Sequence, residues 1–184
     1  NVQAPIQQPV MTGPTSVCAG GGNYTFTLNL EQSGVNYNWT VPTGAVLTGS
    51  GDTVNVNFLN SVSGQVCVTP QNVCGTGTPV CKTVQVNPIP SADLSSSAEI
   101  CDGESVDLHF ALTGNGPFDV IWTVANQPFT LNNIANGHVE TVSPTQTTTY
   151  KIINISDNSI PACALAVADS VTITVWQNFS ATAA

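Results

Sequence analysis

The chain has almost no positive charge. None of its 184 residues is Arg and its only two Lys residues are Lys82 and Lys151, so the formal net charge is −9. Proteins that bind nucleic acid or anionic membranes meet phosphate with clusters of Arg and Lys. The composition therefore argues against both classes of partner.

Long apolar runs are also absent. No stretch approaches the roughly 20 residues needed to span a bilayer, which predicts no membrane insertion. No window shows the apolar period of an amphipathic helix. The hydrophobic content of 41% nevertheless argues for a folded protein. The chain begins at Asn1 without an initiator Met, which suggests a mature or excised form.

What the chain does have is a repeated spacing. Cys18 precedes Trp39 by 21 residues, and Cys101 precedes Trp122 by 21 residues. A length of 184 residues fits two domains of about 90 residues each. The stiff Pro88-Ile89-Pro90 segment lies between the two copies. The spacing therefore predicts tandem modules, which favours a spacer or adhesive unit over an enzyme.

Alternating apolar and polar residues predict β-strands in both modules. The clearest alternations lie at residues 24–30, 35–41, 106–112 and 118–124. The segment TGSGD at 48–52 is interpreted as a turn. The fold class expected is all-β, with two tandem Ig-like antiparallel β-sandwiches of about seven short strands each. Their predicted boundaries are 1–88 and 89–184, and the second includes an unassigned tail over 176–184.

The six cysteines allow 15 pairings, which the repeat narrows. Cys18 and Cys101 are equivalent, and Cys74 and Cys163 each follow the strand before the last. The predicted bridges are therefore Cys18–Cys74 and Cys101–Cys163, with Cys67–Cys81 between outward positions of neighbouring strands. A zinc site at Cys67, Cys74 and Cys81 is the weaker alternative, because no CxxC knuckle or nearby His supports it. Disulfides indicate an extracellular location.

Catalytic and metal motifs are scarce. His109 lies at an outward-facing position of its predicted strand, and His138 follows Gly137 as a turn residue would. No Ser-His-Asp arrangement is therefore indicated. Glu104 and Asp107 are a weak glycosidase pair. We expect no enzyme and no cofactor. The one metal hypothesis is a structural calcium ion at a cluster after the linker, made of Asp93, Glu99, Asp102 and Glu104.

The aromatic residues divide into two groups. Trp39 and Trp122 lie at inward-facing positions of their predicted strands, so we expect each to pack in the core of its module. Phe129, Trp176 and Phe179 are less constrained, so they are the aromatic side chains to consider for partner binding.

The motifs of both halves resemble one family of repeats. VCAGG at 17–21, YNWTVPTGA at 37–45 and VTPQNVCGTGT at 68–78 resemble the PKD-like, Ig-type repeats of Bacteroidetes cell-surface adhesins, including gliding-type adhesins. ICDGESVDL at 100–108, GNGPFDVIW at 114–122 and SPTQTTTYKI at 143–152 resemble a sister Ig-like repeat of the same proteins.

The resemblance implies an exported protein that acts in adhesion, surface motility or as a stalk. It also implies O-glycans on the Ser or Thr of an Asp-Ser/Thr-apolar motif. Asp52-Thr53-Val54 and Asp169-Ser170-Val171 match that motif, so Thr53 and Ser170 are candidate glycosylation sites.

Three functions remain open. The first hypothesis is a stalk segment of a surface adhesin, and the second is a subunit of a surface filament. The third is a glycan-binding accessory module of a secreted hydrolase. The expected partners are neighbouring copies or flanking modules of the same surface protein, with strand addition through a terminus, or glycans.

Overall fold

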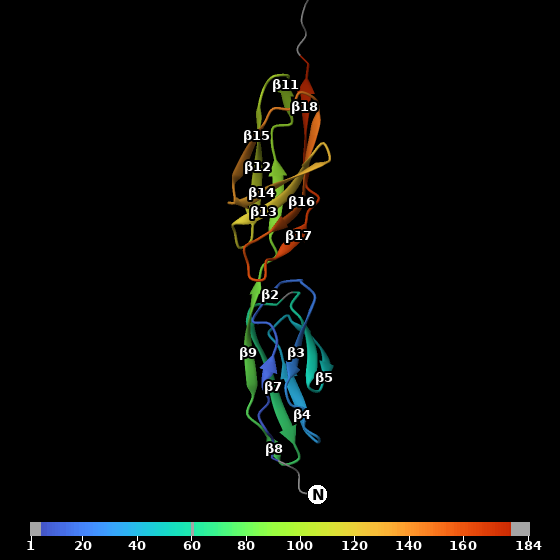
Figure 1. Cartoon of the computed structure of the whole chain (residues 1–184), viewed down its shortest axis with the longest axis vertical. Helices are drawn as coiled ribbons and strands as arrows, with labels where there is room; N and C mark the ends of the chain where they lie inside the picture. The colour runs from blue at the N-terminus through green and yellow to red at the C-terminus, as the bar shows by residue number, and fades with distance from the viewer. Residues whose placement is uncertain (1–4, 60, 178–184) are drawn as a thin grey trace, which may run out of the picture. The chain divides into compact units, whose positions relative to one another are not determined.

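The computed structural model describes residues 5–59 and 61–177. All regular structure in these ranges is β-strand, which confirms the predicted all-β class. None of it forms a helix with the length and apolar character that crossing a bilayer requires. The chain divides after Pro88 into two compact units (Figure 1). Each unit has its own hydrophobic core.

The first unit contains two sheets. The strand order of one sheet is β1 (Met11–Thr12), β3 (Asn23–Leu28), β6 (Thr53–Asn57) and β5 (Val46–Ser50). The order of the other is β2 (Ser16–Cys18), β9 (Val80–Asn87), β7 (Gly64–Asn72) and β4 (Asn36–Thr40), with the short β8 (Gly75–Thr76) on β7. The facing side chains of the two sheets form one core around Phe26, Val56 and Phe58.

The second unit repeats this plan with longer strands. A three-stranded sheet has the order β10 (Ser91–Ser95), β12 (Val106–Thr113) and β15 (His138–Val142). The other sheet has the order β11 (Glu99–Cys101), β18 (Ser170–Trp176), β16 (Thr148–Ser156), β13 (Phe118–Val124) and β14 (Gln127–Ile134), with β17 (Ala164–Ala166) on β16.

The alternation of β12 shows why these sequences form half-buried strands. Val106, Leu108, Phe110 and Leu112 are buried, and every residue between them is exposed. Successive side chains of a strand point to opposite faces, so this pattern places one apolar face on the core. Each such side chain stabilises the fold by roughly 1.5–3 kcal/mol when fully buried.

The second strand of each unit, β2 or β11, runs parallel to the last strand of that unit, β9 or β18. Cys18 at the end of β2 is the register partner of Asn87 in β9, and Cys101 at the end of β11 is the register partner of Trp176 in β18. The two cysteines therefore occupy equivalent positions, as the repeated spacing predicts.

One strand changes sheet between the units. In the first unit β5 pairs with β6, whereas in the second unit β14 pairs with β13 and so joins the opposite sheet. Neither strand was predicted, and the interpretation of Thr48–Ser50 as part of a turn is wrong because the turn is confined to Gly51 and Asp52. Gly49, with φ of +93°, lets β5 continue through a backbone conformation that other residues rarely adopt.

Candidate functional site

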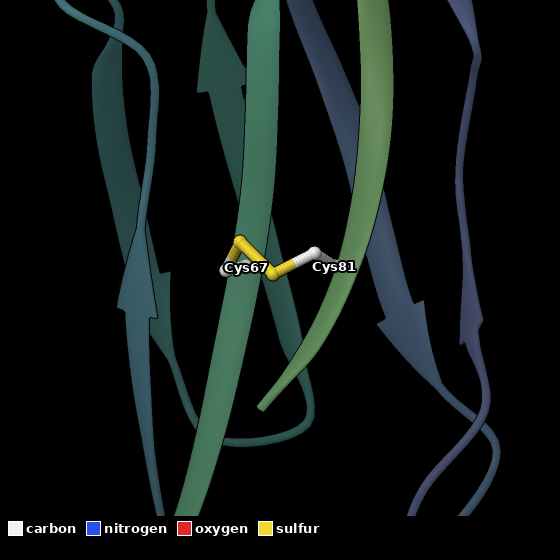
Figure 2. The surroundings of a disulfide bond; sticks show 2 residues. All are labelled: Cys67 and Cys81. Carbon is white, nitrogen blue, oxygen red and sulfur yellow. A yellow bond between two sulfur atoms is a disulfide. The ribbon is translucent and has the colours of Figure 1, made fainter. Parts of the chain in front are cut away.

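One disulfide staples the outer face of the first unit. Cys67 on β7 and Cys81 on β9 are register partners with a Cα–Cα distance of 4.1 Å, and their sulfurs are bonded (Figure 2). Their neighbours Val66 and Val68 are buried, so both cysteines point away from the core. The predicted Cys67–Cys81 bridge is confirmed, and it removes the ligands of the zinc alternative.

The other two predicted bridges are wrong, because Cys74 and Cys101 are exposed free thiols. Cys74 lies in the turn between β7 and β8, beyond the start of β9, whereas Cys18 lies level with Asn87 at the end of β9. The eight residues of β9 separate the two positions by about 25 Å at roughly 3.3 Å per residue. A disulfide requires Cα atoms within about 7 Å.

The same argument excludes Cys101–Cys163. Cys101 lies beside Trp176, at the end of β18 that pairs with the start of β16. Cys163 follows the far end of β16, where its carbonyl accepts the Asp157 N–H at 2.9 Å. The nine residues of β16 separate these two ends by about 25 Å. Sequence comparison between repeats identified equivalent cysteines but could not tell which end of the sandwich each pair occupies.

Two of the residues considered for catalysis, Glu104 and Asp107, make structural hydrogen bonds. Glu104 Oε2 accepts the Cys101 N–H at 2.9 Å in the turn after β11, and Asp107 Oδ1 accepts the Thr141 hydroxyl at 2.7 Å. His109 is exposed, as its parity predicts. His138 begins β15 instead of forming a turn, and its Nε2 lies 3.3 Å from Glu140 Oε2.

The calcium prediction is not supported. Within residues 5–59 and 61–177 no group of three or more His, Cys, Asp or Glu side chains could hold a metal ion. Asp93 lies on β10 opposite Ala111, in a different sheet from Glu99 on β11. Asp102 and Glu104 follow β11, so the four acids are close in sequence only.

The two tryptophans differ in their environment. Trp122 is 5% exposed, and its ring lies 5.8 Å from that of Phe110 and 5.9 Å from that of Tyr150, which confirms its role in the core. Its Nε1 makes no hydrogen bond in the described part of the chain. Trp39 packs at the edge of the first core, remains partly exposed, and donates from Nε1 to the Gly51 carbonyl at 2.9 Å.

Among residues 5–59 and 61–177, the exposed aromatic side chains form no continuous platform. Phe129 on β14 is 51% exposed and Trp176 on β18 is 58% exposed. The strands β16 and β13 separate them in the sheet, a distance of roughly 14 Å at about 4.8 Å per strand. Phe179 and the tail residues 178–184 lie outside the described residues.

Both candidate glycosylation sites are exposed. Thr53 is the first residue of β6, and Ser170 is the first residue of β18. In each motif the carbonyl of the preceding Asp accepts a neighbouring N–H, from Leu28 to Asp52 at 2.8 Å and from Ile152 to Asp169 at 2.9 Å. The motifs are therefore held by the sheet while the hydroxyl-bearing side chains remain accessible.

A buried carboxylate organises one end of the second unit. Asp157 is 5% exposed and accepts main-chain N–H groups of Asn115, Ser159 and Cys163 at 3.0–3.2 Å, and the Ser159 hydroxyl at 3.1 Å. Burial raises the pKa of this carboxyl, but these hydrogen bonds outweigh burial and hold the pKa below its usual value. Asp157 therefore acts as a structural anion.

A groove lies beside the outer edge of β9. It has a volume of about 470 Å³ and is lined by Gln8–Met11 on one side and Val80–Lys82 on the other. Lys82 is half-buried on the core-facing side of β9, between the inward positions Val80 and Val84. Sequence reasoning missed this residue, although a Lys that interrupts an apolar alternation was the available signal.

Comparison with known proteins identifies the type of domain. Residues 4–86, which span the first unit, match the family described as PKD-like domain. A search of curated proteins finds no match. Among solved structures, an I-band fragment of titin superposes with a TM-score of 0.53 at 14% identity over 94% of this chain and 66% of that chain.

A second structural neighbour agrees with the first. Extracellular domains 3–5 of Drosophila OTK superpose with a TM-score of 0.53 at 13% identity, over 93% of this chain and 63% of that chain. The chain thus spans less than two thirds of the length of these two structures. At such identities the likeness shows fold alone. The chain consists of two tandem Ig-like β-sandwiches, and the first of them matches the PKD-like family.

Proposed function

We propose that this chain is a non-enzymatic, extracellular structural or adhesive protein, either a stalk segment of a surface adhesin or a subunit of a surface filament. The observation that carries the proposal is the tandem Ig-like architecture of the described residues. Domains of the PKD-like and Ig-like types are common in extracellular adhesion and structural proteins.

The disulfide supports the extracellular location. A cross-strand bridge such as Cys67–Cys81 persists in oxidising compartments and is rare in the reducing cytosol. The exposed hydroxyls of Thr53 and Ser170 are compatible with the glycosylation that we propose for both sites. The Bacteroidetes origin and the gliding-type adhesin family remain part of this proposal.

The test is microscopy of the source cells. Antibodies against the chain should label the surface of unpermeabilised cells, and electron microscopy should show thin surface fibres or stalks at the labelled positions. Labelling confined to the cytoplasm would contradict the proposal. The competing function, a glycan-binding accessory module, would be indicated by binding on a glycan array that is lost on Phe129→Ala or Trp176→Ala.

A further inference from the structure

Strand β9 has an edge that its own unit covers only in part. On one edge β7 pairs along Val80–Val84, and on the other β2 pairs only along Gln85–Asn87. Along the first half of the β2-side edge no strand of the described part of the chain is paired with β9, because β1 lies near it but pairs with β3 in the other sheet. The groove lined by Gln8–Met11 lies at this position.

The hydrogen bonds of β9 show which main-chain groups face that open edge. Gln85 donates its N–H to Thr15 O on the β2 side at 2.8 Å, and Val86 donates to Ser63 Oγ on the β7 side at 2.9 Å. Along a strand these groups alternate between the two edges. The main-chain N–H and C=O groups of the odd-numbered residues of β9 therefore point toward the β2 side.

The N–H and C=O groups of Cys81 and Thr83 consequently point into the open edge. The Cα–Cα distance of 4.1 Å between Cys81 and Cys67 agrees, because such short distances belong to register pairs whose main-chain groups point outward. The open edge therefore presents the main-chain N–H and C=O groups of Cys81 and Thr83 for hydrogen bonds to an added strand.

Lys82 determines which strand could add there. Its side chain lies on the core-facing side of β9, and no ion pair in the described residues includes it. A charge that points inward from an edge strand normally prevents pairing with another edge. A strand that brings a carboxylate to the same position would be accepted, since the two charges would then neutralise each other.

The second unit carries an edge strand with that property. β15 is the last strand of its sheet and pairs only with β12 among the described strands. Its central residue, Glu140, shares the core-facing side with His138 and Val142, and its side chain is 38% exposed. The second half of the chain contains nine acids and one Lys, whereas the first half contains two acids and one Lys. Both halves are therefore net negative, so the attraction that favours this pairing is the local one between Lys82 and Glu140.

We propose that two copies of this chain associate edge to edge, with the open edge of β9 in one copy paired with β15 of another and with Lys82 facing Glu140. This inference rests on the structural role proposed above and deepens it by naming a second copy as the partner. Because each copy carries both edges, the contact is heterologous, and its repetition produces open chains or rings.

Among the other edge strands, β14 is the strongest competitor, because it is longer than β15 and is also free on one side. It carries Pro128, which lacks the N–H that an added strand requires, and it has no charged residue. Pairing through β14 is therefore an outcome that the test must separate from pairing through β9 and β15.

The test is sedimentation velocity of the whole chain over a range of concentrations at physiological ionic strength, which screens the repulsion between copies of net charge −9. We expect concentration-dependent association that Lys82→Glu or Glu140→Lys weakens at least about tenfold, because each variant juxtaposes like charges. The double variant Lys82→Glu/Glu140→Lys should restore it. Lys151→Glu, which changes the exposed Lys of β16, is the matched control and should resemble the wild type after allowance for net charge.

A backbone variant and hydrogen exchange give independent readouts. Thr83→Pro removes an N–H that faces the open edge while leaving the β7 ladder intact, so it should abolish association, and Thr83→Ala should not. On association the amides of Cys81 and Thr83 should gain protection from exchange. A monomeric wild type, a charge swap that fails to restore association, or protection at β14 instead would overturn the proposal. None of these results would affect the surface labelling that tests the proposed function.

Discussion

Replacing both members of the cross-strand disulfide should destabilise the first unit strongly and leave the second unchanged. We consider the double variant Cys67→Ser/Cys81→Ser, because a single replacement would leave a reactive thiol. Cys81 is exposed and Cys67 is half-buried on the outward face, so serine introduces no polar group into the core. The loss should therefore arise from the missing covalent link.

The magnitude follows from the size of the closed loop. The bridge spans a sequence separation of 14 residues. In the chain-entropy treatment a loop of about 15 residues restricts the unfolded chain by roughly 3 kcal/mol at 25 °C. For a domain of this size, each kcal/mol shifts Tm by about 4–8 °C, so Tm of the first unit should fall by roughly 12–24 °C.

Hydrogen exchange followed by mass spectrometry separates the two units. In the double variant the most protected amides of β7 and β9 should exchange about a hundredfold faster, which corresponds to a loss of roughly 3 kcal/mol. Amides of β12 and β16 should exchange as in the parent chain. Cys74→Ser removes an exposed free thiol and is the matched control, with an expected change within about 0.5 kcal/mol.

Two results would refute this reasoning. A loss below about 1 kcal/mol would show that the bridge does not act through the unfolded chain as the loop-closure argument requires. Faster exchange spread equally over both units would show that the units do not unfold independently.

Three further predictions concern other residues. Asp157→Asn should cost the second unit about 2–3 kcal/mol at pH 7, because its main-chain donors lose a buried anionic acceptor. The pKa of Asp157 is lower in the folded than in the unfolded state, so its contribution to the free energy of unfolding is present above about pH 4 and is lost as pH falls through the folded pKa. Urea unfolding of the variant and the parent should therefore show a smaller difference in free energy of unfolding at pH 3 than at pH 7. Trp39→Phe loses the hydrogen bond to the Gly51 carbonyl and should cost about 1 kcal/mol of stability beyond the change in packing, whereas Trp122→Phe removes a buried N–H without a partner and should carry no such additional cost. Calorimetry of both variants measures the two costs. An equal additional cost would contradict the difference in hydrogen bonding between the two tryptophans. Under native, non-reducing conditions maleimide should label the peptides that contain Cys74 and Cys101, and labelling of the peptide that contains Cys67 would contradict the disulfide.

The strand faces could be predicted because alternation reports burial directly. Residues 106–112 alternate in the sequence and in the structure, and the outward parity of Cys67 and Cys81 followed from the valines beside them. The same parity rule, applied to Lys82, would have shown a charge on the core-facing side of β9. The position of Lys82 among the inward-facing residues of β9 was therefore visible in the sequence, although the overall composition did not point to it.

What could not be predicted is which elements lie at the same end or in the same sheet. Cys74 and Cys18 belong to one module, yet the length of β9 keeps them apart, and no local pattern records that distance. The exposed strand β14 has little alternation to detect, since only Leu131 and Ile134 are even partly buried. The acids near Asp93 are neighbours along the chain, but strand pairing assigns them to different sheets.

The parallel pairing of β2 with β9 and of β11 with β18 has a mechanical consequence. In each unit the second strand and the last strand run in the same direction, side by side. Once the first strand of a unit has detached from its neighbour, tension between the two ends of the unit would slide the second and last strands past each other along their length. Their hydrogen bonds would be strained together, as in shear, and would not open one after another as in a zipper. Each unit is thus arranged to resist stretching along the chain.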